Sequence, residues 1–526
     1  YLYRVSIFLM WTLNGVKSKR AVLALIIALT TTVGAQPSAP TDTTIAGRSY
    51  TLLEAGELMD LLGSANDHSR LALRQTAVKG RLSSLAANLD TVRAALELTD
   101  VLFLDEVLLA EVVFLGPVIF SRTTFAADLS LAEAQFLQSF ALRECEIRQK
   151  TNLRDARFTA TADFTQSHLA AAFSCAGAHF SDATFARLRC EGGAYFEDVL
   201  FTGQVDFSDA RFAGVASFKT ARWRAPVSFA GARFLDRSFF WQAQFDAADF
   251  SSARFAGKTS FKQAAFAHRA TFANIAFAHS AHFEKARFDD GAVFDGSIFA
   301  KEAIFTGVHS DDDLLLNALF RISLDLRHLV TPSLDLRPSA AMPDSLLGPK
   351  AQLLLQNARF QRLFSTWDHL RGHLAQPPEQ ANYDLDRVYA GLRHQFLISG
   401  MAADARGCYI ESLDRRRLHL PWTSIERYAL IAFGLSSRYG TDLKRLALVA
   451  LAWVALFALL YRLLLIDDRR MPLVECLLFS LHTFFIVGAA SVRPQGKVRF
   501  LVLFQALSGW LFWSLCIAVL VSFLLR

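Results

Sequence analysis

The sequence predicts a mainly β solenoid, followed by an α-helical linker and a two-helix transmembrane module. Three observations carry this prediction. Phenylalanine is very frequent, with 46 copies among 526 residues against 8 tryptophans and 10 tyrosines, as expected when one residue type fills one recurring position. Large apolar residues recur at steps of five and six through the middle of the chain. Two long apolar stretches near the C-terminus flank a shorter, more polar one.

The amino-terminal segment has the features of an export signal. A basic stretch precedes an apolar run of signal-peptide length, residues 21–33, and small residues around Ala35 offer a cleavage site. We therefore assign residues 1–35 to a signal peptide, and an uncleaved anchor is the alternative. Residues 36–100 are expected to form an N-terminal cap and the first irregular coils.

From about residue 100 the large apolar residues keep a regular spacing. Between residues 205 and 234 the steps alternate five and six, and a small or branched residue stands two positions before each large one. Such a step fits neither the 3.6-residue period of a helix nor the two-residue period of a strand. It fits a solenoid whose chain turns a corner after each step. The large residues of this stretch are Phe207, Phe212, Phe218, Trp223, Phe229 and Phe234.

This pattern resembles the pentapeptide-repeat family, in which a central Leu or Phe follows a small residue two positions earlier. The resemblance implies a right-handed, four-sided β-helix, which we place at residues 101–307. A coil of about 22 residues then gives about nine coils and a rod of about 45 Å, at about 4.8 Å per coil. The stacked phenylalanines should form a ladder inside the rod, and the extra residue at alternate steps should enlarge some corners.

The cysteines and histidines of the repeats are expected to be structural. Cys175 and Cys190 fall on large inward positions and Cys145 on a small one, which predicts buried core thiols. Three histidines fall on outward positions without a partner at ligand spacing: His268, His279 and His282. We predict no metal site and no cofactor. The sequence has no Gly-rich phosphate loop, GxSxG or HExxH motif, so no enzyme activity is predicted.

Residues 308–445 are predicted to form a helical linker. Ser310, followed by acidic residues and then an apolar run, is typical of a capped helix start. Residues 383–417 predict two amphipathic helices joined around Gly400. The segment 424–445 has an apolar side and basic residues, which predicts a helix lying along a membrane surface.

Residues 446–526 are predicted to form a two-span membrane module. The first span is residues 446–466 and the second is residues 500–525, which carries no charge. Between them lies FSLHTFFIVGAAS, residues 479–491, which is too short and too polar to cross a bilayer. This order resembles that of two-span tetrameric ion channels of the potassium-channel type. The resemblance implies that the middle segment is a re-entrant pore loop.

The same resemblance assigns the filter. If Thr483 marks the end of the pore helix, the aligned filter run is Ile486, Val487, Gly488, Ala489, Ala490 and Ser491. The potassium-channel signature is Thr-Val-Gly-Tyr-Gly, whose carbonyl rings select the ion. Val487 and Gly488 are the surviving matches, so the residues do not support potassium selectivity.

The second span also carries candidate pore residues. Gly509 is a candidate hinge of the inner helix. Ser514, Ala518 and Ser522 recur every four residues and would share one small, wettable helix face. A close helix-packing seam explains this face equally well.

Two functions remain open from the sequence. One is a channel-like oligomer, a tetramer if it is a channel, with the repeat domain outside the cytoplasm. The other is a non-conducting, membrane-anchored scaffold that binds proteins on the solenoid flank. Both place the chain in a bacterial inner membrane with lipid as a partner. Net charge +6 in such a protein indicates lipid contact and not nucleic acid. With a cleaved signal, the basic loop between the spans lies in the cytoplasm and the pore loop enters from that side.

Overall fold

The computed structural model describes most of the chain in two compact units, Tyr1–Pro378 and Glu379–Arg526. The described residues are 42–45, 48–66, 69–340, 346–375, 383–464, 472–485 and 498–524. The predicted signal peptide, residues 1–35, lies outside them. Each unit is described by itself.

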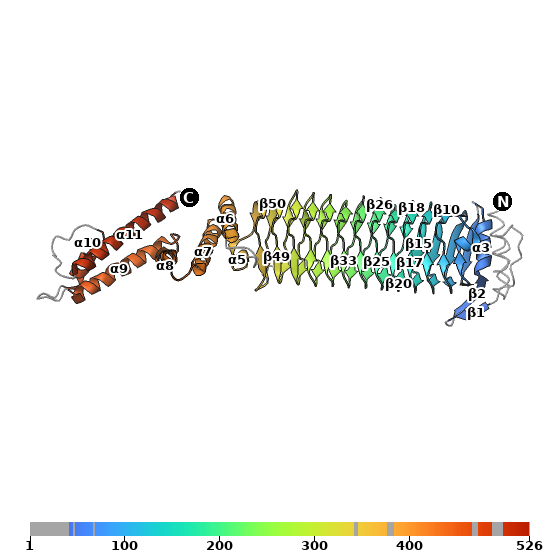
Figure 1. The fold of residues 1–526 in the computed structure, drawn as a ribbon, viewed down its shortest axis with the longest axis horizontal. Helices are drawn as coiled ribbons and strands as arrows, with labels where there is room; N and C mark the ends of the chain where they lie inside the picture. The colour runs from blue at the N-terminus through green and yellow to red at the C-terminus, as the bar shows by residue number, and fades with distance from the viewer. Residues whose placement is uncertain are drawn as a thin grey trace, which may run out of the picture. The chain divides into compact units, whose positions relative to one another are not determined.

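The first unit is a β-solenoid of about 13 turns with four short parallel strands in each turn (Figure 1). One turn consists of β28 (Arg211–Phe212), β29 (Ala216–Ser217), β30 (Arg222–Trp223) and β31 (Val227–Ser228). Arg211 pairs with Arg233 of the next turn, so a turn takes 22 residues here, as the sequence predicted. β28 lies in a 14-stranded sheet and β29 in a 13-stranded one, while the β30 and β31 columns share a 25-stranded sheet.

Two kinds of corner alternate around each turn. At every second corner one residue adopts the left-handed conformation, as Asp209 and Thr220 do with φ of 56°. These tight corners lie within the five-residue steps, whereas the six-residue steps, such as Phe212 to Phe218, turn without a left-handed residue. The extra residue at alternate steps thus lies at the corners that have no left-handed residue, and the enlargement of those corners stays a prediction.

Stacked aromatic rings fill the interior. Phe250 stacks between Phe229 and Phe272 of the neighbouring turns, with ring centroids 4.8 and 5.1 Å away. Rings from adjacent faces meet edge to face, as Phe245 and Phe250 do at 5.9 Å. Burying each large side chain stabilises the fold by roughly 1.5–3 kcal/mol, so the phenylalanine ladder is the main source of solenoid stability.

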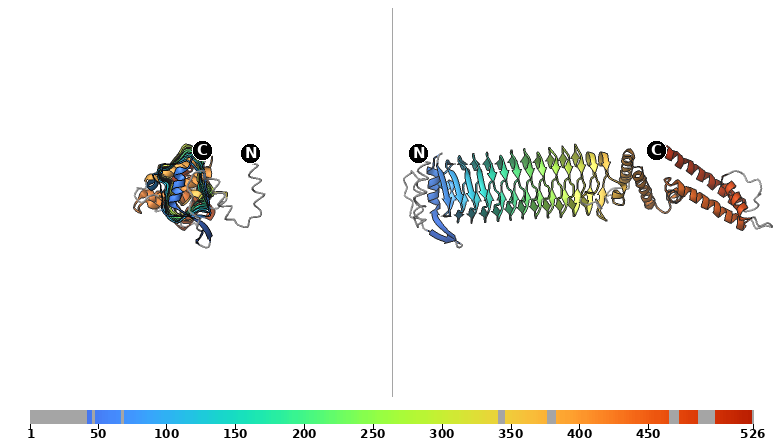
Figure 2. Two further views of the ribbon diagram at one scale, coloured as in Figure 1. Left: turned by 90° about the vertical axis from the view of Figure 1, so that its right-hand side faces the viewer. Right: turned by 180° about the vertical axis from the view of Figure 1, so that it is seen from behind.

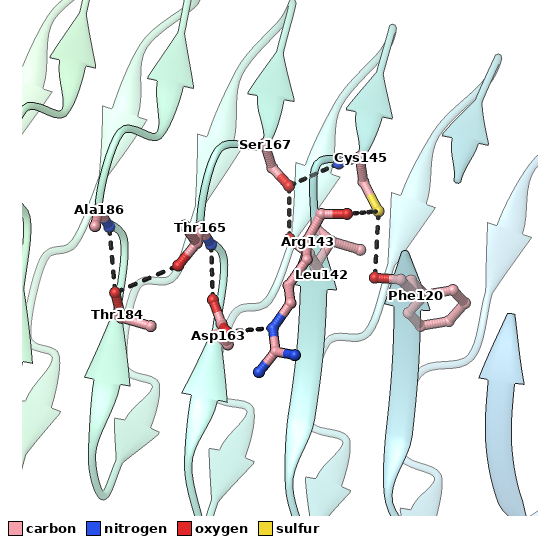
Figure 3. Close-up of polar contacts among 9 residues, drawn as sticks. All are labelled: Phe120, Leu142, Arg143, Cys145, Asp163, Thr165, Ser167, Thr184 and Ala186. Atoms are coloured by element: carbon pink, nitrogen blue, oxygen red, sulfur yellow. Dashed lines mark hydrogen bonds and ion pairs between the residues drawn. The ribbon is translucent and has the colours of Figure 1, made fainter. Parts of the chain in front are cut away.

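Small inward side chains bond to the backbone of the preceding turn. Figure 3 shows Ser167 donating to the Leu142 carbonyl at 2.5 Å and Cys145 approaching the Phe120 carbonyl at 3.5 Å. The expected burial of the repeat cysteines is confirmed. Burial raises the pKa of the Cys145 thiol to about 12, so this thiol is protonated and unreactive at neutral pH.

A helix covers the amino-terminal end of the solenoid. β1 (Asp42–Ile45) and β2 (Arg48–Glu54) form an antiparallel pair, and α3 (Ala55–Ser64) follows at the end of the stack (Figure 1). Leu58, Met59 and Leu62 of α3 are buried. This helix shields the apolar interior and the first strands, which would otherwise offer an open sheet edge.

The solenoid extends past residue 307, and the helix predicted to begin at Ser310 was wrong. That segment forms β46 (His309–Ser310), β47 (Leu314–Leu315) and β48 (Leu319–Phe320). Ser310 is buried and pairs in register with Phe288, so a serine stands where the stacked ladder has a phenylalanine. This substitution makes the repeat hard to recognise in the sequence. The stack continues through β50 (Val330–Asp335) to β52 (Arg359–Phe364), followed by the short helix α5 (Trp367–Leu370).

The second unit is helical (Figure 2). α6 (Tyr383–Ile398) and α7 (Ala402–His419) are joined at Gly400, which has φ of 74°, as the sequence predicted. α8 (Ile425–Ser437) follows. α9 (Leu443–Leu464), α10 (Leu473–Phe484) and α11 (Val498–Leu524) then pack together.

Candidate functional site

Two of the last three helices are long enough to cross a bilayer and one is not. Within the described residues, Leu443–Leu464 and Val498–Ile517 are long and apolar enough to span a membrane, which agrees with the two predicted spans. The 12 residues of α10 reach about 18 Å, short of the roughly 30 Å of a hydrocarbon core. α10 contacts both α9 and α11.

A buried polar network joins the three helices. The Tyr461 hydroxyl of α9 donates to the Gln505 side-chain oxygen of α11 at 2.6 Å. The Gln505 amide donates to the Ser480 hydroxyl of α10 at 2.6 Å and to the Ser480 carbonyl at 3.1 Å. The Ser480 hydroxyl donates to the Val454 carbonyl of α9 at 2.7 Å. Tyr461, Gln505 and Ser480 are each 0% exposed, and within the described residues their polar groups bond to one another and to the Val454 carbonyl.

This network fixes where α10 sits. In a bilayer core an unpaired polar group is costly, so helices that share such bonds are held in one register. The sequence reasoning missed Gln505 and Ser480. Gln505 is the one amide side chain in the span at residues 500–525, and a polar side chain of this size in a membrane span is a signal that would have identified it.

A second contact lies one turn further along α11. The Trp453 indole N–H of α9 donates to the Ser508 hydroxyl at 2.9 Å, and that hydroxyl donates to the Gln505 carbonyl at 2.8 Å. Around it, Phe457, Tyr461 and Phe479 form a buried cluster against which Trp453 packs. The polar network is therefore enclosed by aromatic side chains.

Gly509 lies where α11 crosses the end of α10. A Cβ atom built on Gly509 would overlap the Phe484 carbonyl oxygen and stand 3.0 Å from the carbonyl carbon. A side chain at this position would push the two helices apart. The structure thus gives Gly509 a close-packing role, and its role as a hinge stays a prediction.

The structure reaches part of the predicted filter and pore face. Thr483 lies buried in the last turn of α10, where its hydroxyl donates to the Phe479 carbonyl at 2.8 Å. The filter run, residues 486–491, lies outside the described residues. Ser514 is exposed on α11 and bonds to the Trp510 carbonyl at 3.0 Å. Ala518 and Ser522 also lie in α11, but their side chains are outside the described part. The filter and pore-face roles stay predictions.

A polar corner connects the membrane helices to the helices before them. The Tyr439 hydroxyl, between α8 and α9, donates to Asp414 of α7 at 2.6 Å. Arg417 pairs with the same carboxylate at 3.1 Å. Burial first, and then the bond to Asp414, raise the pKa of Tyr439 to about 12. The bond therefore ties α7 to the segment that leads into α9.

Comparisons with known families agree with both parts of the chain. The family described as pentapeptide repeats (9 copies) matches residues 176–222, 196–244 and 207–254. The family described as ion channel matches residues 448–526, which include α10, α11 and most of α9. No curated protein and no solved structure matches the chain. The chain thus carries pentapeptide repeats and a channel-like ion transport domain, and its apolar helices indicate membrane insertion.

Proposed function

We propose that this chain, which carries pentapeptide repeats and an ion channel domain, forms a homo-oligomeric pore in a membrane. The pore is a tetramer of the two-span module, with the segment after α10 as a filter that differs from the potassium signature. The repeat domain is the extracytoplasmic part of the molecule. Lipid and other copies of the chain are the partners.

The observation that carries this proposal is the attachment of α10 to both spans. A plain two-helix anchor needs no third helix that is too short to cross the bilayer. Here Ser480 of α10 bonds to Val454 of α9 and accepts from Gln505 of α11. Backbone that is not helical is tolerated at membrane depth where protein or a water-filled cavity surrounds it. A short helix fixed at both sides supports a re-entrant loop at its end.

Exposed apolar side chains on α11 support an oligomer in lipid. A single copy leaves several large side chains of α11 more than half exposed. These are Phe500, Leu503, Phe504, Leu507, Trp510, Leu511 and Ile517. Lipid tails and neighbouring copies are the surroundings that suit such a surface.

The orientation follows from the signal and the charges. With residues 1–35 cleaved on export, the solenoid lies outside the cytoplasm of a bacterial inner membrane. The basic loop between α9 and α11 then lies inside, as the positive-inside rule favours. A reporter enzyme fused after Arg470 tests this: activity of a cytoplasm-restricted reporter supports the orientation, and activity of a periplasm-restricted reporter contradicts it.

The second candidate function is a non-conducting scaffold that binds proteins on the solenoid. It is favoured by the regular exposed faces of the repeat, since solenoids more often bind than catalyse. Ion flux from liposomes containing the purified chain separates the two functions. A pore predicts flux above that of empty liposomes and a change in flux for Gly488→Asp. Flux equal to that of empty liposomes would support the scaffold.

A further inference from the structure

A row of four arginines runs along one face of the solenoid. Arg189, Arg211, Arg233 and Arg254 stand on successive strands of one sheet in parallel register. Neighbouring arginines stand on strands about 4.8 Å apart across the sheet, and all four are exposed. Stacked like charges repel one another, so a row of this kind favours contact with a carboxylate-bearing surface.

The arginine row finds little counter-charge within its own chain. Arg211 reaches Glu191 at a long 3.9 Å. The side chains of Arg189, Arg233 and Arg254 make no hydrogen bond or ion pair in the described part of the chain. The charge of the row is therefore available to a partner.

The adjoining face carries carboxylates at matching heights. Asp206 and Asp249 point outward from β27 (Val205–Asp206) and β35 (Ala248–Asp249). Each uses one oxygen to accept a backbone N–H two residues on, at 2.8 Å, and neither has a cation partner in the described structure. Asp163, in the same column, differs because Arg143 neutralises it within the chain (Figure 3).

The two faces share a tight corner and the same turns. β27 directly precedes β28 in one turn, so Asp206 and Arg211 lie at the same height along the solenoid axis. Two turns further along the solenoid, Asp249 and Arg254 likewise lie at the same height. In the turns that carry Arg189 and Arg233, the position that corresponds to Asp206 is occupied by Thr184 and Ser228.

We propose that the solenoid packs side by side with other copies of this chain, with the arginine row of one copy facing the Asp206–Asp249 face of the next. In a ring of four, each copy meets its two neighbours through surfaces about a right angle apart, as adjoining faces of a four-sided solenoid are. Rotation about an axis parallel to the solenoid keeps every copy at one height. Arg211 of one copy then lies opposite Asp206 of the next, and Arg254 opposite Asp249.

Membrane attachment makes such a contact effective. Exposed ion pairs are individually weak and screened by salt, so the solenoid alone is not expected to assemble tightly. Copies joined through their membrane helices face one another at a high effective concentration. The inference therefore rests on the oligomer of the proposed function, but its test does not require a measured ion current.

Cysteine cross-linking in membranes tests the contact. Tagged full-length chains with Arg233→Cys are co-expressed with chains carrying Ser228→Cys, and treated with a bis-maleimide spanning about 10 Å, the distance between packed sheets. We expect a cross-linked pair containing one chain of each kind. The wild type measures any background from Cys516, which is half-buried in α11. Replacing Arg233→Cys by Arg222→Cys, on β30, is the matched control and should give no product.

Charge exchange then tests the pairing. Arg211→Asp with Arg254→Asp in both chains should remove most of the product, as should Asp206→Arg with Asp249→Arg. Combining all four substitutions should restore it. Product from Arg233→Cys chains alone, equal product from the control pair, or a yield indifferent to charge would overturn the proposal. Tight heparin binding by the arginine row with no cross-linked pair would overturn it in favour of a polyanionic ligand. Cross-links without ion flux would leave this inference standing and count against the pore alone.

Discussion

The Gln505 amide of α11 donates a 2.6 Å hydrogen bond to the Ser480 hydroxyl of α10, and both side chains are fully buried. This bond attaches the short helix to the second span, while Ser480 also bonds to the first span. A double-mutant cycle with Gln505→Leu and Ser480→Ala measures it. We expect a coupling free energy of about 0.6–1.7 kcal/mol, between the average and the maximum found for side-chain hydrogen bonds between membrane helices.

The control cycle pairs Gln505→Leu with Ser514→Ala. Ser514 is exposed and bonds within its own helix, so its effect should add to that of Gln505→Leu without coupling. Thermal unfolding in detergent gives both cycles. Equal coupling in the two cycles would show that the Gln505–Ser480 bond does not hold α10 in place.

The close approach of α11 to Phe484 predicts an unusual response to alanine at Gly509. Gly509→Ala should destabilise the second unit by about 1–3 kcal/mol, because the added methyl group overlaps the Phe484 carbonyl oxygen. Gly391→Ala in α6 is the matched control, since nothing lies within 4 Å of its added Cβ. That change should stabilise the helix by about 0.5–1 kcal/mol. Two shifts of the same sign in thermal unfolding would contradict the packing described at Gly509.

The aromatic ladder predicts a local weakness when one ring is removed. Phe250→Ala should cost about 3–5 kcal/mol, because it leaves a cavity between Phe229 and Phe272. Hydrogen exchange should rise first in the turns next to residue 250, since each solenoid turn contacts only its neighbours. Leu235→Ala, at a side chain 42% exposed, should change neither property by much. Uniform loss of protection along the whole solenoid would argue against turn-by-turn stability.

The Tyr439–Asp414 bond predicts a pH-dependent stability. The pKa of Tyr439 is raised from 10.0 to about 12, so the folded state favours the protonated phenol. The stabilisation is therefore present below pH 10 and is lost as the pH rises toward 12. At pH 8 the Tyr439→Phe variant should be less stable than the wild type by about 1.5–3 kcal/mol, the range for a bond to a charged group.

Thermal unfolding between pH 8 and pH 11 checks this prediction. The difference between wild type and Tyr439→Phe should shrink above pH 10. Tyr428→Phe, at an exposed side chain of α8, should match the wild type throughout. A difference that stays constant to pH 11 would show that the Tyr439 hydroxyl does not titrate with folding.

The sequence predicts the solenoid well because its signal repeats at every turn. Each large residue has counterparts about 22 residues before and after it, so a single exception hardly weakens the periodic pattern. The prediction fails at Ser310, where a serine takes the ladder position and acidic residues follow it. Without a phenylalanine at this position the repeat is hard to recognise, and Ser310 with the acidic residues after it is typical of a helix start.

The membrane module is predicted by length and apolar character, but its internal contacts are not. The two spans and the helix between them follow from composition. The contacts of Gln505 with Tyr461 and Ser480 depend on how three helices rotate against one another, which no local pattern encodes. The position of Gly509 in the span predicts a hinge, which stays a prediction, and its close approach to the Phe484 backbone is visible only in the structure.

Unitary current in planar bilayers tests the central claim most directly. Purified full-length chain should give discrete current steps, and Ser514→Cys should give similar steps before modification. Attaching a cationic methanethiosulfonate to Ser514→Cys should lower the amplitude for cations, because a fixed positive charge on the pore face repels them. The wild type, with its own Cys516, is the control for this reagent. Absence of steps, or equal amplitudes before and after modification, would contradict a pore lined by this face of α11.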